Sequence, residues 1–107
     1  MRLRRSPFDD VVERQLALFA GDEAALLAEA AEAEEAWIQA GREDAEEAYG
    51  DFQLVVDAIA DRLLELREAY AATLADDKVD AYRRSFAAGV RRRFGRYRSL
   101  VSDVEPD

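Results

Sequence analysis

Mostly apolar residues recur at alternating steps of four and three along the middle of this chain. The series contains the following positions: Ala45, Tyr49, Phe52, Val56, Ile59, Leu63, Leu66, Tyr70 and Thr73. Residues three and four apart lie on one face of an α-helix, so this spacing predicts a long helix with an apolar seam. Apolar residues outside the seam, such as Leu54 and Leu64, favour a helix that is covered from more than one side.

The same periodicity predicts three further helices, which complete an all-α, antiparallel bundle of four helices. We expect these helices in the following ranges: about 7–20, 23–40, 43–75 and 78–102. The turns between them are so short that helices that follow one another in the chain are expected to pack antiparallel, with the long third helix central. The bundle forms a single domain over 1–107, in which a basic arm (1–5) and an acidic tail (103–107) are expected to be flexible.

Helical spacing also assigns the inward-facing residues of the other three helices. In the first helix these are Phe8, Val11, Val12, Leu16 and Phe19. In the second they are Leu26, Leu27, Ala30, Ala33, Trp37 and Ile38. In the last they are Val79, Tyr82, Phe86, Val90, Phe94, Tyr97 and Val101.

Residues near the helix ends support these boundaries. Ser6 and Asp9 flank Pro7 in the pattern of a capping box, in which a serine oxygen accepts an early backbone amide and the acid reaches back. Gly21 follows the first helix and is expected to end it in a left-handed conformation. Gly50 lies inside the third helix, where a glycine is typical of a kink or a close contact.

Charge is divided unevenly along the chain. The net charge of −9 is the sum of +1 over residues 1–21, −14 over 22–80 and +4 over 81–107. The acidic middle can neutralise the basic C-terminal segment within one molecule or between two copies. Together with the long seam, this segregation predicts self-association, with a homodimer as the leading expectation.

The absence of cysteine and histidine narrows the possible chemistry. It excludes disulfides, thiolate catalysis and a Ser–His–Asp triad, and it removes the commonest metal ligand. No apolar run approaches the ~18 residues of a membrane-spanning helix. We therefore expect a cytoplasmic protein that needs no cofactor and no membrane.

Carboxylates are dense where the second predicted helix meets the third. The run Glu46-Glu47-Ala48-Tyr49-Gly50-Asp51-Phe52-Gln53-Leu54-Val55 resembles the second metal motif of the MazG-like all-α nucleotide pyrophosphohydrolases, although Glu47 and Asp51 are four apart where the family has three. The resemblance implies that Glu32, Glu35, Glu47 and Asp51 hold Mg²⁺ and that a metal-bound water attacks a nucleotide phosphate. A solvated acidic helix face accounts for the same residues without chemistry.

The last predicted helix is rich in arginine. Five of these arginines are candidates for contacts with phosphates or with an acidic protein partner: Arg84, Arg91, Arg92, Arg96 and Arg98. Phosphate contacts would indicate nucleic-acid binding. The overall charge of −9 repels nucleic acid, which makes such a partner the less favoured one.

Glu34 is unusual because it lies near the middle of the apolar face of its helix. A buried charge is costly unless it is paired and hydrogen-bonded. We therefore predict a structural ion pair between Glu34 and either Arg83 or Arg93 of the last helix.

The sequence contains no recognisable catalytic constellation. Its pattern favours a small helical protein-interaction or adaptor protein that self-associates and presents helical faces to a protein partner. Two alternatives stay open: a MazG-like, Mg²⁺-dependent pyrophosphohydrolase and a nucleic-acid-binding protein.

Overall fold

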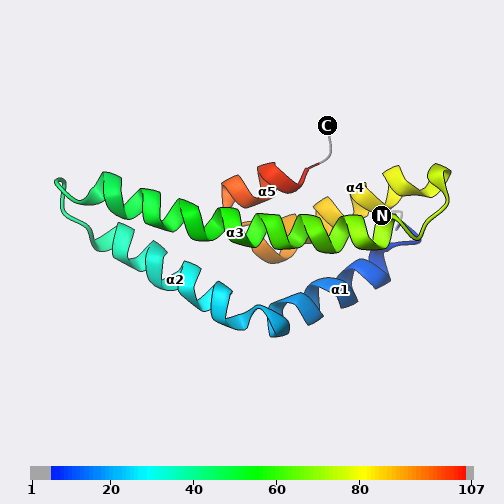
Figure 1. Ribbon diagram of the computed structural model, residues 1–107, viewed down its shortest axis with the longest axis horizontal. Helices are drawn as coiled ribbons and strands as arrows, with labels where there is room; N and C mark the ends of the chain where they lie inside the picture. Colours follow the sequence, from blue (N-terminus) through cyan, green and yellow to red (C-terminus); the bar gives the residue numbers. More distant parts are fainter. Residues whose placement is uncertain (1–5, 106–107) are drawn as a thin grey trace, which may run out of the picture.

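The computed structural model describes residues 6–105, so the basic arm predicted at 1–5 and the last two residues of the predicted tail lie outside the described part. Within this range the chain is all-helical, as predicted, and has no strand (Figure 1). No helix there is both long and apolar enough to cross a membrane. The helices are α1 (Asp9–Asp22), α2 (Ala24–Gln39), α3 (Ala45–Ala71), α4 (Asp76–Phe94) and α5 (Arg98–Val104).

The first two helices form one bent rod, not the antiparallel pair that the sequence predicted. The backbone amide of Glu23, at the bend, donates to the carbonyl of Phe19 at 2.8 Å, and its own carbonyl accepts from Leu27 at 3.0 Å. Gly21 lies inside α1 and lacks the positive φ of a left-handed stop, so the prediction that it ends the first helix was wrong. Arg62 of α3 holds the bend through an ion pair with Glu23 at 2.6 Å.

The rod lies along α3 as a shallow V (Figure 1). Its α2 arm runs antiparallel to the first half of α3, whereas α1, α4 and α5 surround the second half. α3 packs against α2, α4 and α5, and α1 packs mainly against α4. The molecule is therefore elongated, with dimensions of 50 × 34 × 26 Å, and one end of it consists of α2 and α3 alone.

The helix predicted over 78–102 is broken into two. α4 ends at Phe94, and α5 begins at Arg98. α5 runs in the same direction as α3 (Figure 1). A Cβ atom on Gly95 would lie 2.5 Å from the carbonyl oxygen of Arg91, so the tight turn at this position requires glycine. The turn places the Tyr97 ring in the core, 6.0 Å from the ring of Phe52.

The predicted apolar faces form the core. Phe52, Val56, Ile59 and Leu63 of the seam are buried, and so are the predicted inward residues from Tyr82 to Tyr97 on the last helices. Two predicted inward residues are instead exposed near the turn between α2 and α3, Ile38 and Tyr49. They lie where α2 and α3 are covered by no further layer of helices.

The capping box at the start of α1 is confirmed. The backbone amide of Phe8 donates to Ser6 Oγ at 3.2 Å, and the amide of Ser6 donates to Asp9 Oδ2 at 3.0 Å. The other oxygen of Asp9 accepts a hydrogen bond from the buried Ser85 hydroxyl at 2.5 Å. The cap therefore also fixes α1 on α4.

α1 and α4 approach each other closely at Gly89. A Cβ atom there would lie 2.7 Å from Val12 Cγ1 and 3.0 Å from Leu16 Cδ1. The Tyr82 hydroxyl donates to Gln15 Oε1 at 3.0 Å across the same interface, and burial raises the pKa of Tyr82 to about 12. A Cβ added at Gly50, by contrast, would have no atom within 4 Å, so the close contact, one of the two roles expected for this glycine, is absent.

Candidate functional site

The α2–α3 turn and the helix segments beside it project from the body of the molecule. We call residues 29–54 the acidic hairpin. Its two helices are joined by aromatic packing: the Trp37 ring lies 4.8 Å from that of Tyr49 and is stacked on that of Phe52 at 5.7 Å. This packing joins α2 to α3 directly within the projecting element.

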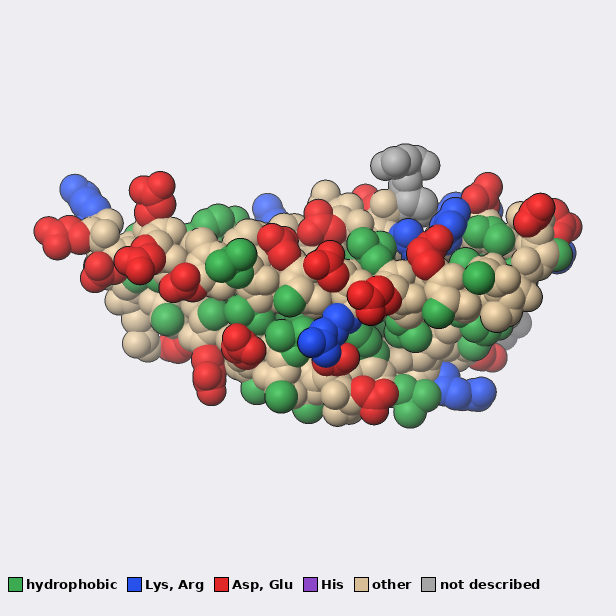
Figure 2. Space-filling model, viewed as in Figure 1, with side chains coloured by type: hydrophobic (Ala, Val, Ile, Leu, Met, Phe, Trp, Pro, Cys, Tyr) green, Lys and Arg blue, Asp and Glu red, His purple; other side chains and the backbone are tan. Residues whose placement is uncertain are grey.

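The acidic hairpin carries a dense negative charge. It contains nine carboxylates and a single arginine, Arg42. Acidic side chains crowd the end of the molecule where α2 turns into α3 (Figure 2). Such a surface attracts cations and positively charged proteins at long range.

The same hairpin also exposes large apolar side chains. Among residues 6–105 four large hydrophobic side chains are exposed, and three of them belong to the acidic hairpin: Ile38 at 66 %, Tyr49 at 44 % and Leu54 at 69 %. The fourth is Leu18 of α1, at 62 %. Leu54 lies in a groove of about 510 Å³ between α2 and α3, beside Ala33 and Ala36. The hairpin thus offers both charge and apolar surface to a partner.

The four residues implied as Mg²⁺ ligands are only partly brought together. Glu32 and Asp51 line the groove that contains Leu54. Glu35 accepts a hydrogen bond from Gln39 at 2.6 Å, and Glu47 is exposed in the first turn of α3. The described part of the chain has no group of three or more acidic residues placed to hold a metal ion.

Glu34 is paired with Arg96, from the turn between α4 and α5, and not with the predicted Arg83 or Arg93. The Glu34 side chain is 15 % exposed and that of Arg96 is 62 % exposed. Arg96 also lies over the ring of Tyr97, 5.2 Å from its centroid, and burial raises the pKa of that tyrosine. The break at Gly95 explains the change of partner, because it brings the turn up to α2.

A small cleft of about 190 Å³ lies beside this ion pair. The cleft is lined by residues of α2, α3, the α4–α5 turn and the start of α5. These residues are Glu34, Trp37, Tyr49, Phe52, Gln53, Arg96, Tyr97, Arg98 and Ser99. The side-chain amide of Gln53 donates to Ser99 Oγ at 2.9 Å. These contacts fix the base of the acidic hairpin on the body of the molecule.

Arg83 belongs to a second ion-pair group, on the opposite part of α3. It donates two hydrogen bonds to Glu68, which also accepts one from Arg67 at 2.7 Å. The hydrogen bonds from Arg83, followed by that from Arg67, hold the pKa of Glu68 below its usual value. Arg67 donates in addition to the carbonyl of Val104 at 3.2 Å, so the group holds the end of α5 in place.

The other arginines of α4 and α5 differ in whether they form ion pairs. Arg91 forms an ion pair with Glu105 at 3.1 Å, whereas Arg84, Arg92 and Arg93 form no ion pair with any residue from 6 to 105. We call these three residues the arginine face. Arg98 lies apart from it, at the cleft beside Glu34.

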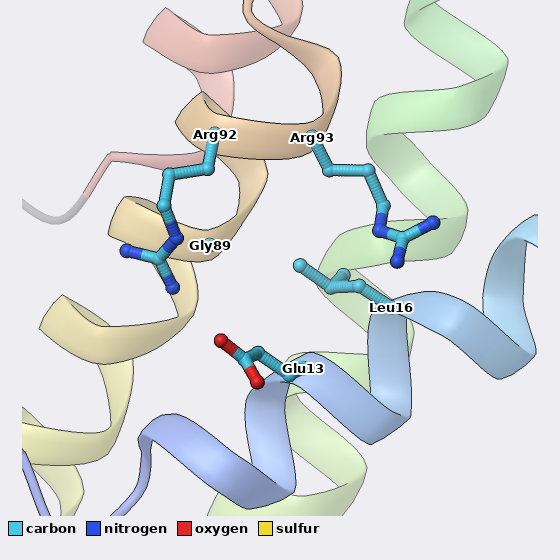
Figure 3. A pocket seen from close by; sticks show the side chains of 5 residues that line it. All are labelled: Glu13, Leu16, Gly89, Arg92 and Arg93. Carbon is cyan, nitrogen blue, oxygen red and sulfur yellow. The ribbon is translucent and has the colours of Figure 1, made fainter.

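The arginine face lies over a hollow between α1 and α4. This hollow has a volume of about 340 Å³ and is lined by Glu13, Leu16, Gly89, Arg92 and Arg93. Figure 3 shows the two arginines reaching from α4 on either side of it, with Glu13 of α1 pointing into it from below. A second hollow of about 490 Å³ continues along α4, where Arg92 and Arg84 both contribute to the wall. Sequence reasoning assigned Arg84 and Arg92 to possible acidic partners but missed Arg93, which it placed in an ion pair.

Comparison of the chain with known protein families, curated proteins and solved structures gives no match in any of the three. Two surfaces of the molecule are therefore the candidates for function, the acidic hairpin and the arginine face.

Proposed function

We propose that this chain is a helical protein-interaction protein and that the acidic hairpin is its binding element. The observation that carries the proposal is the combination of nine carboxylates with three exposed large apolar side chains on one projecting element. The partner surface that matches it is positively charged and carries apolar residues of its own. A basic amphipathic helix has this chemistry.

The two properties of the hairpin have different roles in binding. Its negative charge accelerates encounter with a cationic partner and discriminates against acidic ones. Its apolar residues supply affinity, because full burial of a leucine or isoleucine side chain is worth about 1.5–3 kcal/mol. The packing of Trp37 on Tyr49 and Phe52 fixes the backbone before binding, so little ordering is required on this side of the interface.

The proposal predicts that Leu54→Gln weakens binding to a basic amphipathic peptide. Loss of one buried leucine contact should raise the dissociation constant about tenfold or more. Trp37 is the single tryptophan of the chain and lies in the hairpin, so its fluorescence reports binding directly in a titration.

Leu18→Gln is the matched control, because Leu18 is about as exposed as Leu54 but lies on α1, outside the hairpin. We expect its dissociation constant to equal that of the unmodified chain. If both variants lost affinity equally, or if neither lost affinity, the assignment of the binding element to the hairpin would be contradicted.

The metal-dependent pyrophosphohydrolase is the alternative with one supporting observation, the shared groove of Glu32 and Asp51. A thermal-shift series with Mg²⁺, Mn²⁺ and nucleoside triphosphates separates it from the interaction protein. Metal-dependent stabilisation that is lost in Asp51→Asn would favour the enzyme, and an unchanged melting temperature throughout favours the interaction protein.

A further inference from the structure

We propose that the cationic partner of the acidic hairpin is the arginine face of a second copy of this chain. The two copies lie side by side in opposite directions, and each inserts its hairpin against α1 and α4 of the other. This inference rests on the proposed function, because it names the partner of the same hairpin. It is motivated by the presence of two complementary, separated surfaces on one molecule.

The arginine face has the chemistry that a carboxylate-rich partner needs. Arg84, Arg92 and Arg93 have no ion pair within residues 6–105, although the chain as a whole has a large excess of acid. Arg92 and Arg93 flank one hollow, so two guanidinium groups can meet neighbouring carboxylates of an incoming helix (Figure 3). Guanidinium groups bind carboxylates with two parallel hydrogen bonds, which also fixes orientation.

The hairpin does not contact this face within its own molecule. The α2–α3 turn lies at one end of the 50 Å long molecule (Figure 1), whereas Arg92 and Arg93 line a hollow between α1 and α4 to which no hairpin residue contributes. The hairpin is also fixed at its base, because Glu34 is bound by Arg96 and Gln53 by Ser99. With its base fixed, the hairpin stays away from the arginine face of its own molecule, whereas a second copy can bring the two surfaces together.

Charge also decides which surfaces meet. Contact of two acidic hairpins with each other would place nine carboxylates against nine, which is strongly repulsive. A hairpin against an arginine face is attractive, and a two-fold axis makes this contact twice in one closed dimer. The same symmetry leaves neither surface open, so the assembly stops at two copies.

The test is a charge exchange measured by analytical ultracentrifugation of the full chain. The unmodified chain should be a dimer at low salt and dissociate as ionic strength rises and screens the contact. Arg92→Glu with Arg93→Glu should weaken dimerisation by about 100-fold or more, since like charges then face each other. Glu32→Lys with Glu35→Lys should do the same from the other side, and these lysines suit the C-terminal half of α2.

Mixing the two variants supplies the decisive measurement. The lysine hairpin then meets the glutamate face, and the unmodified hairpin meets the unmodified arginine face, so the mixture should form a heterodimer. Asp61→Lys with Asp103→Lys is the control for the lysine variant. It makes the same charge change as Glu32→Lys with Glu35→Lys, but on exposed sites of α3 and α5 outside both surfaces. This control should dimerise like the unmodified chain.

Three outcomes would overturn the proposal. The first is an unmodified chain that stays monomeric at every concentration and salt, and the second is a mixture of variants that fails to associate. The third is a monomer that binds a fluorescent oligonucleotide through Arg92 and Arg93, which would assign the arginine face to nucleic acid. In each case the peptide titration with Leu54→Gln still tests the hairpin, so failure of the second-copy partner is distinct from failure of the proposed function.

Discussion

The Gly89→Ala variant is expected to lose about 1–3 kcal/mol of folding free energy, the usual effect of forcing extra volume into a packed interface. The added Cβ would lie 2.7 Å from Val12 Cγ1, and the branched side chains of α1 have little room to move because Val12 and Leu16 are buried. α1 must shift away from α4 to relieve the contact. Urea unfolding followed by circular dichroism measures the change.

Gly50→Ala provides the opposite result in the same experiment. Gly50 lies in α3 with open space around the added atom, so alanine should stabilise the helix by up to about 1 kcal/mol. Two substitutions with the same chemistry should therefore move the unfolding midpoint in opposite directions. Equal effects at the two sites would show that α1 and α4 do not approach as closely as described.

The Leu63→Ala variant is expected to lose about 2–5 kcal/mol of folding free energy. Leu63 is fully buried in α3, among side chains of the surrounding helices, and alanine would leave a cavity there. A domain of this size has a total stability of about 5–15 kcal/mol, so this loss is a large share of it. The thermal midpoint should fall accordingly.

Leu54→Ala is the matched control for this second experiment. Leu54 lies on the same helix but is exposed, so its removal should change stability by less than about 0.5 kcal/mol. The two leucines thus separate the core function of α3 from the binding function of the acidic hairpin. A large loss of stability in Leu54→Ala would place this side chain in the core and remove it from the binding surface.

Local sequence signals predicted the features that depend on neighbouring residues. The capping box of Ser6 and Asp9 and the buried stripe from Phe52 to Leu63 follow from spacings of three and four residues alone. These features need no knowledge of how distant helices meet. The all-α class followed from the same spacings.

Features that depend on the meeting of distant segments were predicted poorly. Glu34 was correctly expected to need a cation, but its partner depended on the turn at Gly95, which lies inside an otherwise continuous apolar stripe. Ile38 and Tyr49 have the spacing of core residues but are exposed near the turn between α2 and α3. Spacing shows which face of a helix is apolar, but it does not show what lies against that face.

The sequence likewise did not predict the close contact of α1 with α4. Gly89 follows two alanines in α4, and small residues of this kind permit close helix contacts, but they do not identify the partner helix. The arginine face depends on that contact, since α1 supplies the opposite wall of its hollow. No local sequence pattern therefore predicts the arginine face.

The contacts of α1 with α4 also have a consequence for the order of folding. Asp9 and Ser85 are 76 residues apart, and Gln15 and Tyr82 are 67 apart, so closing these contacts orders most of the chain. The α2–α3 pair is joined by a short turn and can form early, because contacts of small sequence separation have the lowest loop-closure cost. α1 therefore leaves the ribosome before the other four helices described but is among the last of them to be packed, and its apolar face stays accessible until α4 has been made.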